Sequence, residues 1–217
     1  MKINYNNLKR LIKAAWSCQI AGISTDKEII TTEPRASFTI IQWIILFLAI
    51  FLNIFLENGF NIDFCGYTIS ALSFFASIFF TFIVTLQNSF KNIDFNEYQH
   101  DVNILKNKFG CKLINYYEKT TVLSLYLILL STICIILLSC TLLFSSTLNQ
   151  NIEPIRMITN ICHTPLLFTL KATGIFVYRL LVLYFLLDII FIAIDLTSSI
   201  FDFMILEYSE KYNDINK

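Results

Sequence analysis

This 217-residue chain contains little glycine, proline and histidine, and it has no net charge. It has five Gly, three Pro and two His, and its 16 basic residues balance its 16 acidic ones. So few glycines and prolines disfavour a loop-rich all-β fold, which needs many turn residues. The lack of a basic excess argues against nucleic acid as a partner, because binding to phosphates requires a basic face.

The sequence also lacks the residue groups that mark catalytic and metal centres. It contains no G-x-S-x-G, H-E-x-x-H, P-loop or G-x-G-x-x-G motif, and no two cysteines have C-x-x-C spacing. His100 lies in the acidic segment 94–101 without a second histidine or a cysteine cluster, so a solvated surface explains it better than a site. We therefore expect no catalytic residue, no metal and no cofactor, and we expect that the protein is not an enzyme.

Apolar residues are what the chain has in abundance. It is 56% hydrophobic and 15% charged, with a mean hydropathy of +0.64, whereas soluble domains have about 25% charged residues. Four apolar runs have roughly the 20 residues that a helix needs to cross a bilayer. These runs are 38–56, 64–86, 121–144 and 172–206. The sequence thus predicts an all-α polytopic membrane protein with four transmembrane helices.

The distribution of Lys and Arg predicts the orientation of these helices. Basic residues are concentrated in residues 1–37 and in the connector 87–120, and the connector 57–63 has none. Because basic loops stay in the cytoplasm, the amino terminus is expected to be cytoplasmic. We expect a cytoplasmic amino-terminal segment at 1–37, a transmembrane region at 38–206 and a cytoplasmic tail at 207–217, with membrane lipid as the surroundings of the helices.

The fourth run carries three aspartates at intervals of seven residues: Asp188, Asp195 and Asp202. Seven residues return a helix to within about 20° of the same direction, so the three acids form one polar stripe. A helix over 172–206 is about 52 Å long, which exceeds the bilayer and predicts a projection into the cytoplasm. Asp188 should avoid lipid, either in a polar seam packed against another helix or in a water-filled vestibule. Arg179 lies on the opposite side and is expected to extend to the outer interface.

Two further interpretations concern the outer half of the membrane. Cys65 and Cys162 are both expected on or near the outer face, where a disulfide is chemically allowed, although two unrelated thiols explain them as well. Apolar walls with a few hydroxyls suit a small lipophilic ligand, although small polar residues also serve helix packing. The candidate ligand-contacting residues are polar or aromatic and lie on the second to fourth helices: Tyr67, Ser70, Phe74, Ser139, Thr141, Tyr178 and Phe185.

The layout resembles the amino-terminal half of an insect odorant receptor. The likeness rests on "AAWSCQIAGIST" before the first helix, on a very short outer turn, and on "INYYEKTTVLSLYLILL" leading into the third helix. It continues in "NIEPIRMITNICHTPLLF" and in "YRLLVLYFLLDIIFIAIDLTSSIFDFMI". The resemblance covers nearly the whole chain, in layout rather than in a specific motif.

The resemblance implies a multi-pass plasma-membrane protein that senses odorants. Such a receptor has seven transmembrane helices, a cytoplasmic amino terminus, and a ligand site within the membrane for a small volatile or lipophilic compound. It is a subunit of a ligand-gated cation channel, a hetero-tetramer with an odorant co-receptor subunit. The fourth helix extends into a cytoplasmic anchor where subunits meet, and the seventh helix forms the pore. Since four helices are predicted here, the resemblance implies a partial receptor without its pore helix.

Other interpretations remain open. Gustatory receptors share the topology, so a partial gustatory receptor fits the same layout. A complete four-helix membrane scaffold protein also fits, although the predicted outer loop at 145–171 has only Cys162 and lacks the cysteine signature of tetraspanins and claudins. A transporter fragment has less support, because no helix is broken by Gly or Pro and no inverted repeat is visible.

Overall fold

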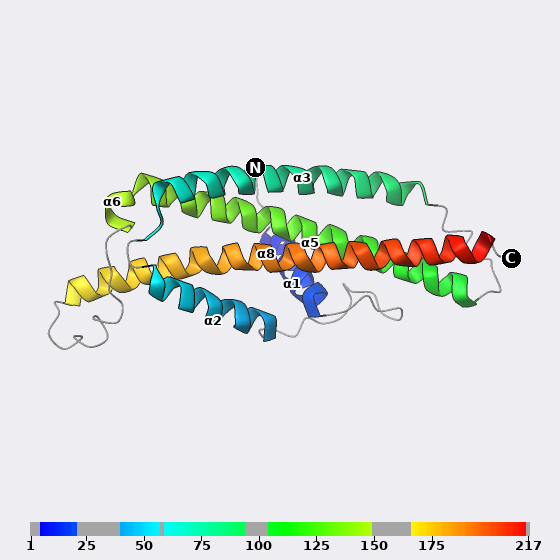
Figure 1. Ribbon diagram of the computed structural model, residues 1–217, viewed down its shortest axis with the longest axis horizontal. Coiled ribbons are helices and arrows are strands. Elements are labelled where there is room, and N and C mark those ends of the chain that lie inside the picture. The colour runs from blue at the N-terminus through cyan, green and yellow to red at the C-terminus, as the bar shows by residue number, and fades with distance from the viewer. Residues whose placement is uncertain (1–4, 21–39, 57–58, 94–103, 149–165, 216–217) are drawn as a thin grey trace. The chain divides into compact units, whose positions relative to one another are not determined.

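The computed structural model describes residues 5–20, 40–56, 59–93, 104–148 and 166–215 (Figure 1). All regular structure in these residues is helical. The helices are α1 (Tyr5–Ile20), α2 (Ile40–Phe55), α3 (Ile62–Lys91), α5 (Ile104–Leu143), α6 (Ser145–Leu148) and α8 (Leu166–Ile215). The all-α prediction is therefore confirmed for the part of the chain that is described.

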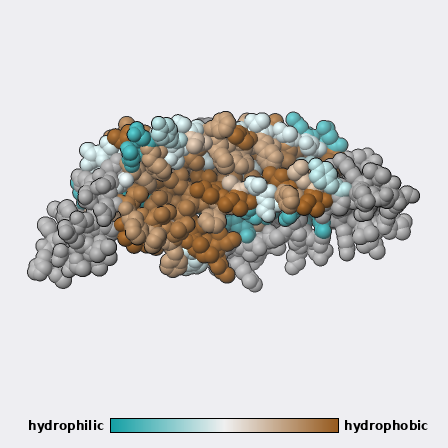
Figure 2. Space-filling model, viewed as in Figure 1, coloured by the Kyte–Doolittle hydropathy of each residue, from teal (hydrophilic) through white to brown (hydrophobic). Residues whose placement is uncertain are grey.

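Three helices are long and apolar enough to cross a membrane. The candidate spans are Ile62–Lys91, Gly110–Leu143 and Leu170–Ile205. α2 is apolar as well but has only 16 residues, or about 24 Å at 1.5 Å per residue. Many large apolar side chains of the described helices are exposed, and they form much of the brown surface in Figure 2. In water such a surface would be strongly unfavourable, whereas hydrocarbon solvates it.

α3, α5 and α8 are longer than the apolar runs that predict them, whereas α2 is shorter than its predicted run 38–56. α5 begins at Ile104, so the predicted connector 87–120 is helical in its second half. α3 continues to Lys91, and α8 begins at Leu166 and ends at Ile215. Hydropathy marks only the lipid-compatible part of a helix, while good helix formers such as Lys, Glu and Leu allow it to continue into polar sequence.

The chain forms two compact units. The first unit contains Met1–Ser37, Ser77–Ile128 and Phe191–Lys217. The second contains Phe38–Ala76 and Leu129–Ile190. Because the unit boundaries fall within α3, α5 and α8, each of these three helices contributes one portion to each unit.

In the second unit, α5 and α8 pack through residues spaced three and four apart. This spacing keeps side chains on one helix face, so each helix buries a continuous seam. The buried residues on these faces are Leu130, Cys134, Leu138 and Thr141 of α5, and Ala172, Ile175, Arg179 and Val182 of α8, of which Ala172 and Ile175 pack against Leu148 of α6. Cys134 Sγ lies 4.0 Å from the carbonyl oxygen of Val182, so the two backbones approach closely.

α2 adds an amphipathic layer to the second unit. Its buried face is more polar than its exposed face, since it holds Gln42 and Asn53 together with Ile45 and Ala49. Asn53 Nδ2 donates a hydrogen bond of 3.0 Å to the carbonyl oxygen of Phe176 in α8. The exposed face carries aromatic rings at every fourth position: Trp43, Phe47, Phe51 and Phe55. A helix with its polar residues inside and its aromatic residues outside is suited to lipid on the exposed side.

In the first unit, aromatic stacking joins α5 to the carboxyl-terminal part of α8. The rings of Tyr116 and Phe203 stack with centroids 4.0 Å apart and an interplanar angle of 11°. α1 packs in the same unit with Ala15 and Cys18 fully buried, and Trp16 Nε1 donates to Tyr126 Oη at 3.3 Å.

Candidate functional site

The predicted ligand-contacting residues of α3 are on its surface. Tyr67 and Phe74 are 78% and 69% exposed. The Ser70 hydroxyl is exposed as well and donates to the carbonyl oxygen of Gly66 at 3.0 Å. A serine that bonds the preceding helical turn satisfies itself locally, as is common within apolar helices. These three residues therefore form an aromatic surface, and their one serine hydroxyl is hydrogen-bonded within its own helix.

Two of the predicted residues on α5 and α8 come into direct contact. Thr141 Oγ1 and Tyr178 Oη lie 3.2 Å apart. Both hydroxyls also hydrogen-bond to the carbonyl oxygen of Leu137. The structure thus brings Thr141 and Tyr178 together in a small polar cluster within the second unit.

Ser139 and Phe185 have more local environments. Ser139 Oγ donates to the carbonyl oxygen of Ile135 at 2.8 Å. The half-buried ring of Phe185 lies beside that of Tyr184, with centroids 6.0 Å apart. Neither contact identifies a ligand, so the ligand-binding role of the predicted set stays a prediction.

Arg179 is buried against neighbouring helix ends, and its position at the outer interface of the membrane stays a prediction. Its side chain is 3% exposed. Nη1 donates to the carbonyl oxygen of Leu56 at 3.1 Å, and Nε and Nη2 donate to that of Leu148 at 3.2 and 2.8 Å. Leu56 follows the last residue of α2, and Leu148 ends α6. The last carbonyls of a helix have no partner within the helix, so a buried guanidinium is favourable at these two ends.

The three aspartates share one side of α8 but have three different environments. Asp188 is buried, with 3% of its surface exposed. Asp195 is half-buried and pairs with Lys119 of α5, with Nζ and Oδ1 3.3 Å apart. Asp202 is exposed. Each aspartate directly precedes a residue that is buried or half-buried, namely Ile189, Leu196 and Phe203, so the stripe borders the packed seam.

The Lys119–Asp195 pair belongs to a polar cluster in the first unit that the sequence did not predict. Lys119 is only 5% exposed, and Cys18 of α1 is fully buried nearby. Burial raises the pKa of the Cys18 thiol to about 12, and the carboxylate of Glu118 acts in the same direction. The thiol is therefore protonated at neutral pH and unreactive.

The predicted Cys65–Cys162 disulfide stays a prediction. Cys65 is buried with a free thiol, and Cys162 lies outside the described residues. Within the ranges that are described, no three His, Cys, Asp or Glu side chains gather in a way that suits a metal ion.

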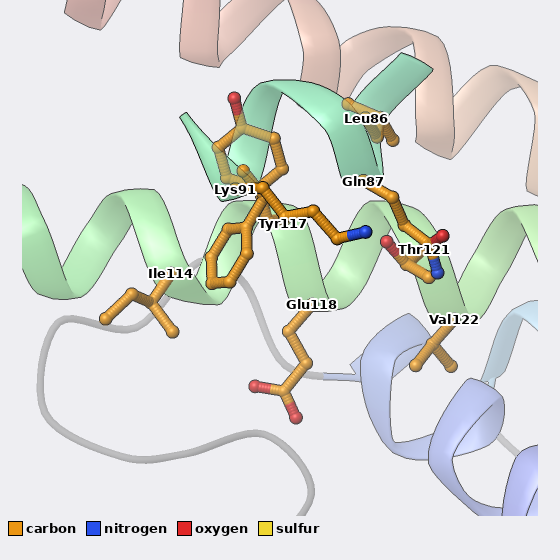
Figure 3. A pocket seen from close by; sticks show the side chains of 9 residues that line it. Leu86, Gln87, Lys91, Ile114, Tyr117, Glu118, Thr121 and Val122 are labelled. Atoms are coloured by element: carbon orange, nitrogen blue, oxygen red, sulfur yellow. The ribbon is translucent and has the colours of Figure 1, made fainter. Parts of the chain in front are cut away.

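A groove in the first unit runs between the end of α3 and the beginning of the apolar part of α5 (Figure 3). Its volume is about 670 Å³. The lining is largely apolar with several polar groups: Leu86, Gln87, Phe90, Lys91, Ile114, Tyr117, Glu118, Thr121 and Val122. No sequence pattern indicates this groove, because most of its residues fall in or beside the segment 87–120, which hydropathy predicts to be a connector.

Comparisons with protein-family models, with curated proteins and with solved structures found no match to this chain.

Proposed function

We propose that this chain is part of an insect odorant receptor, the odorant-sensing subunit of a ligand-gated cation channel in the plasma membrane. In this proposal four helices cross the membrane, and the amino terminus and the end of α8 are cytoplasmic. The odorant is a small volatile or lipophilic molecule, and the channel assembles with an odorant co-receptor subunit.

The observation that carries the proposal is the length of α8. It is one helix of 50 residues, uninterrupted in Figure 1, and therefore about 75 Å long. A bilayer accounts for less than half of that length. A fourth helix that extends far into the cytoplasm is what the resemblance to odorant receptors implies, and neither a compact four-helix scaffold nor a transporter needs one.

The surface of the extended part of α8 supports a role in subunit assembly. Four apolar side chains at spacings of three and four are exposed there: Phe201, Met204, Ile205 and Tyr208 are 62%, 44%, 51% and 63% exposed. Tyr208 lies beyond the candidate span Leu170–Ile205, and the other three lie at its cytoplasmic end in the proposed topology, so a second subunit is the natural partner of this face.

The charge on α1 and α3 supports the proposed orientation. Lys9, Arg10 and Lys13 of α1 are exposed, and α3 ends at exposed Lys91. In the proposed topology all four cations face the cytoplasm, as the positive-inside rule requires.

The experiment is co-purification with the co-receptor. The tagged chain and an odorant co-receptor are expressed together in insect-cell membranes, extracted in mild detergent and weighed by native mass spectrometry. We expect a complex that contains both chains. The double variant Ile205→Ser/Tyr208→Ser should reduce the co-receptor recovered, while Asp202→Asn on the same exposed part of α8 should not. A chain that is recovered without co-receptor, at full expression of both, would favour the four-helix scaffold.

A further inference from the structure

The groove of the first unit has two kinds of wall. Leu86, Ile114 and Val122 are aliphatic, and Phe90 and Tyr117 are aromatic, with ring centroids 5.3 Å apart in an edge-to-face arrangement. Beside them Gln87, Lys91 and Thr121 contribute an amide, an ammonium and a hydroxyl. A volume of about 670 Å³ is within the range of sites that hold a small organic ligand.

The polar groups of the groove are directed toward one another. Figure 3 shows the side chains of Lys91, Gln87 and Thr121 extending toward the same part of the groove, whereas the Glu118 carboxylate points away from them. An ammonium, an amide and a hydroxyl all donate hydrogen bonds, and together they suit an acceptor with several oxygens. Phosphate is such an acceptor.

The place of the groove along the helices indicates where that phosphate comes from. Its walls belong to α3 and α5, which are both candidate membrane spans, and Lys91 is the last residue of α3. The aliphatic Leu86 and Val122 lie on the side of the apolar core of each helix, and Lys91 lies at the polar end. A lysine at the end of a membrane helix sits at the level of the lipid headgroups. The groove is thus apolar where acyl chains lie and cationic where phosphates lie.

We propose that this groove is a binding site for one glycerophospholipid. Its phosphate is held by Lys91, Gln87 and Thr121, and the beginning of an acyl chain lies against Leu86 and Val122. This site is separate from the proposed odorant site, because it lies in the first unit while all the candidate odorant-contacting residues belong to the second. The lipid holds α3 to α5 where the two helices emerge from the apolar region.

The test is lipid retention by the purified full chain. The chain is exchanged into detergent micelles with equal amounts of phosphatidylcholine, phosphatidylglycerol and diacylglycerol, and bound lipid is counted by native mass spectrometry. We expect one tightly retained phospholipid per chain and no retained diacylglycerol, which has the same acyl chains without the phosphate. Lys91→Gln should lower occupancy about fivefold, the effect of one lysine near a lipid surface of about 1 kcal/mol. Lys112→Gln is the matched control, since Lys112 is a cation on α5 that does not line the groove, and it should leave occupancy unchanged.

A second pair of variants tests the shape of the groove independently of charge. Ile114 lines the groove and Leu125 does not, although both are on α5 and they are 42% and 40% exposed. Ile114→Trp should displace the lipid, and Leu125→Trp should not. Equal retention of diacylglycerol and phospholipid, or lipid occupancy that neither Lys91→Gln nor Ile114→Trp lowers, would overturn the proposal and leave only non-specific lipid around the helices. Since no co-receptor is present, this result is independent of the proposed channel function.

Discussion

Arg179 on α8 and Leu56 at the end of α2 are joined by a hydrogen bond of 3.1 Å from Nη1 to the carbonyl oxygen. The same guanidinium also holds the carbonyl oxygen of Leu148 at the end of α6. One buried side chain thus donates hydrogen bonds to carbonyl groups at two helix ends that are far apart in sequence. A lysine has a single donor group and cannot reach both carbonyls in this planar arrangement.

Replacement of Arg179 should therefore destabilise the second unit. We expect Arg179→Met to lower the free energy of unfolding in mixed micelles by about 2–4 kcal/mol, because two buried carbonyls lose charged partners. Arg179→Lys should lower the free energy of unfolding less, since the ammonium can keep a hydrogen bond to one of the two carbonyl groups. Lys171→Met, an exposed cation on the same helix, is the control and should change stability little. Equal stability of Arg179→Met and the control would mean that the hydrogen bonds of Arg179 to the two helix ends do not stabilise the fold.

The Lys119–Asp195 pair should show measurable coupling in a double-mutant cycle. The side chains are 7% and 40% exposed, so water screens the pair in part and the coupling should be about 1 kcal/mol. Asp195→Asn should lower the free energy of unfolding more than Lys119→Met does. The first change leaves the buried ammonium of Lys119 without its anion, whereas the second leaves the carboxylate of the partly exposed Asp195, which water can solvate. Unfolding free energies of the two single variants and the double variant give the coupling. Additive losses would mean that the two charges do not interact.

The Tyr178 hydroxyl should contribute to stability through Thr141 and the carbonyl oxygen of Leu137. We expect Tyr178→Phe to lower the free energy of unfolding by about 1 kcal/mol, because it removes the hydroxyl and keeps the ring. Tyr67→Phe makes the same chemical change at a side chain that is 78% exposed, so it should have almost no effect. If a lipophilic ligand uses Tyr178 instead, the loss will appear in ligand affinity and not in stability.

Cys18 should resist alkylation, and Cys111 should not. Cys111 is exposed, whereas Cys18 is fully buried with a pKa raised to about 12. Relative to an ordinary thiol, that pKa lowers the thiolate fraction at pH 8 by roughly a thousandfold. The folded protein treated with maleimide at pH 8 should carry label at Cys111, and Cys18 should react only after unfolding. Because a raised pKa disfavours the thiolate in the folded state, the protection should persist to pH 9. Rapid labelling of Cys18 in the folded chain would mean that α1 does not pack as described.

How much the sequence predicted depends on the kind of feature. Long apolar runs predict helices well, because a chain in lipid must satisfy its backbone hydrogen bonds within each segment. The beginning of α5 and the two ends of α8 lie outside the predicted apolar runs, since polar helical residues such as Lys112 or Glu207 look like connectors on a hydropathy scale. The burial of Arg179 could not be predicted for a related reason. A lone arginine near the end of an apolar run usually extends to water, and no local pattern shows that two helix ends meet at its guanidinium.

The aspartate stripe shows the limit of periodicity as evidence. The seven-residue interval predicts that Asp188, Asp195 and Asp202 share a side of one helix, and all three lie on α8. What each acid faces depends on the neighbouring helices: Asp188 is buried, Asp195 meets Lys119, and Asp202 is exposed. Lys119 lies 76 residues from Asp195 in sequence, and nothing in either local segment identifies the other as its partner.

The most direct test of the proposed receptor identity is the sequence of the native transcript downstream of the codon for Lys217. The proposal predicts an open reading frame that continues into three further apolar helices, of which the last forms a pore. An abundant native transcript that stops at that codon and yields a stable four-helix protein would contradict a channel subunit and favour a membrane scaffold.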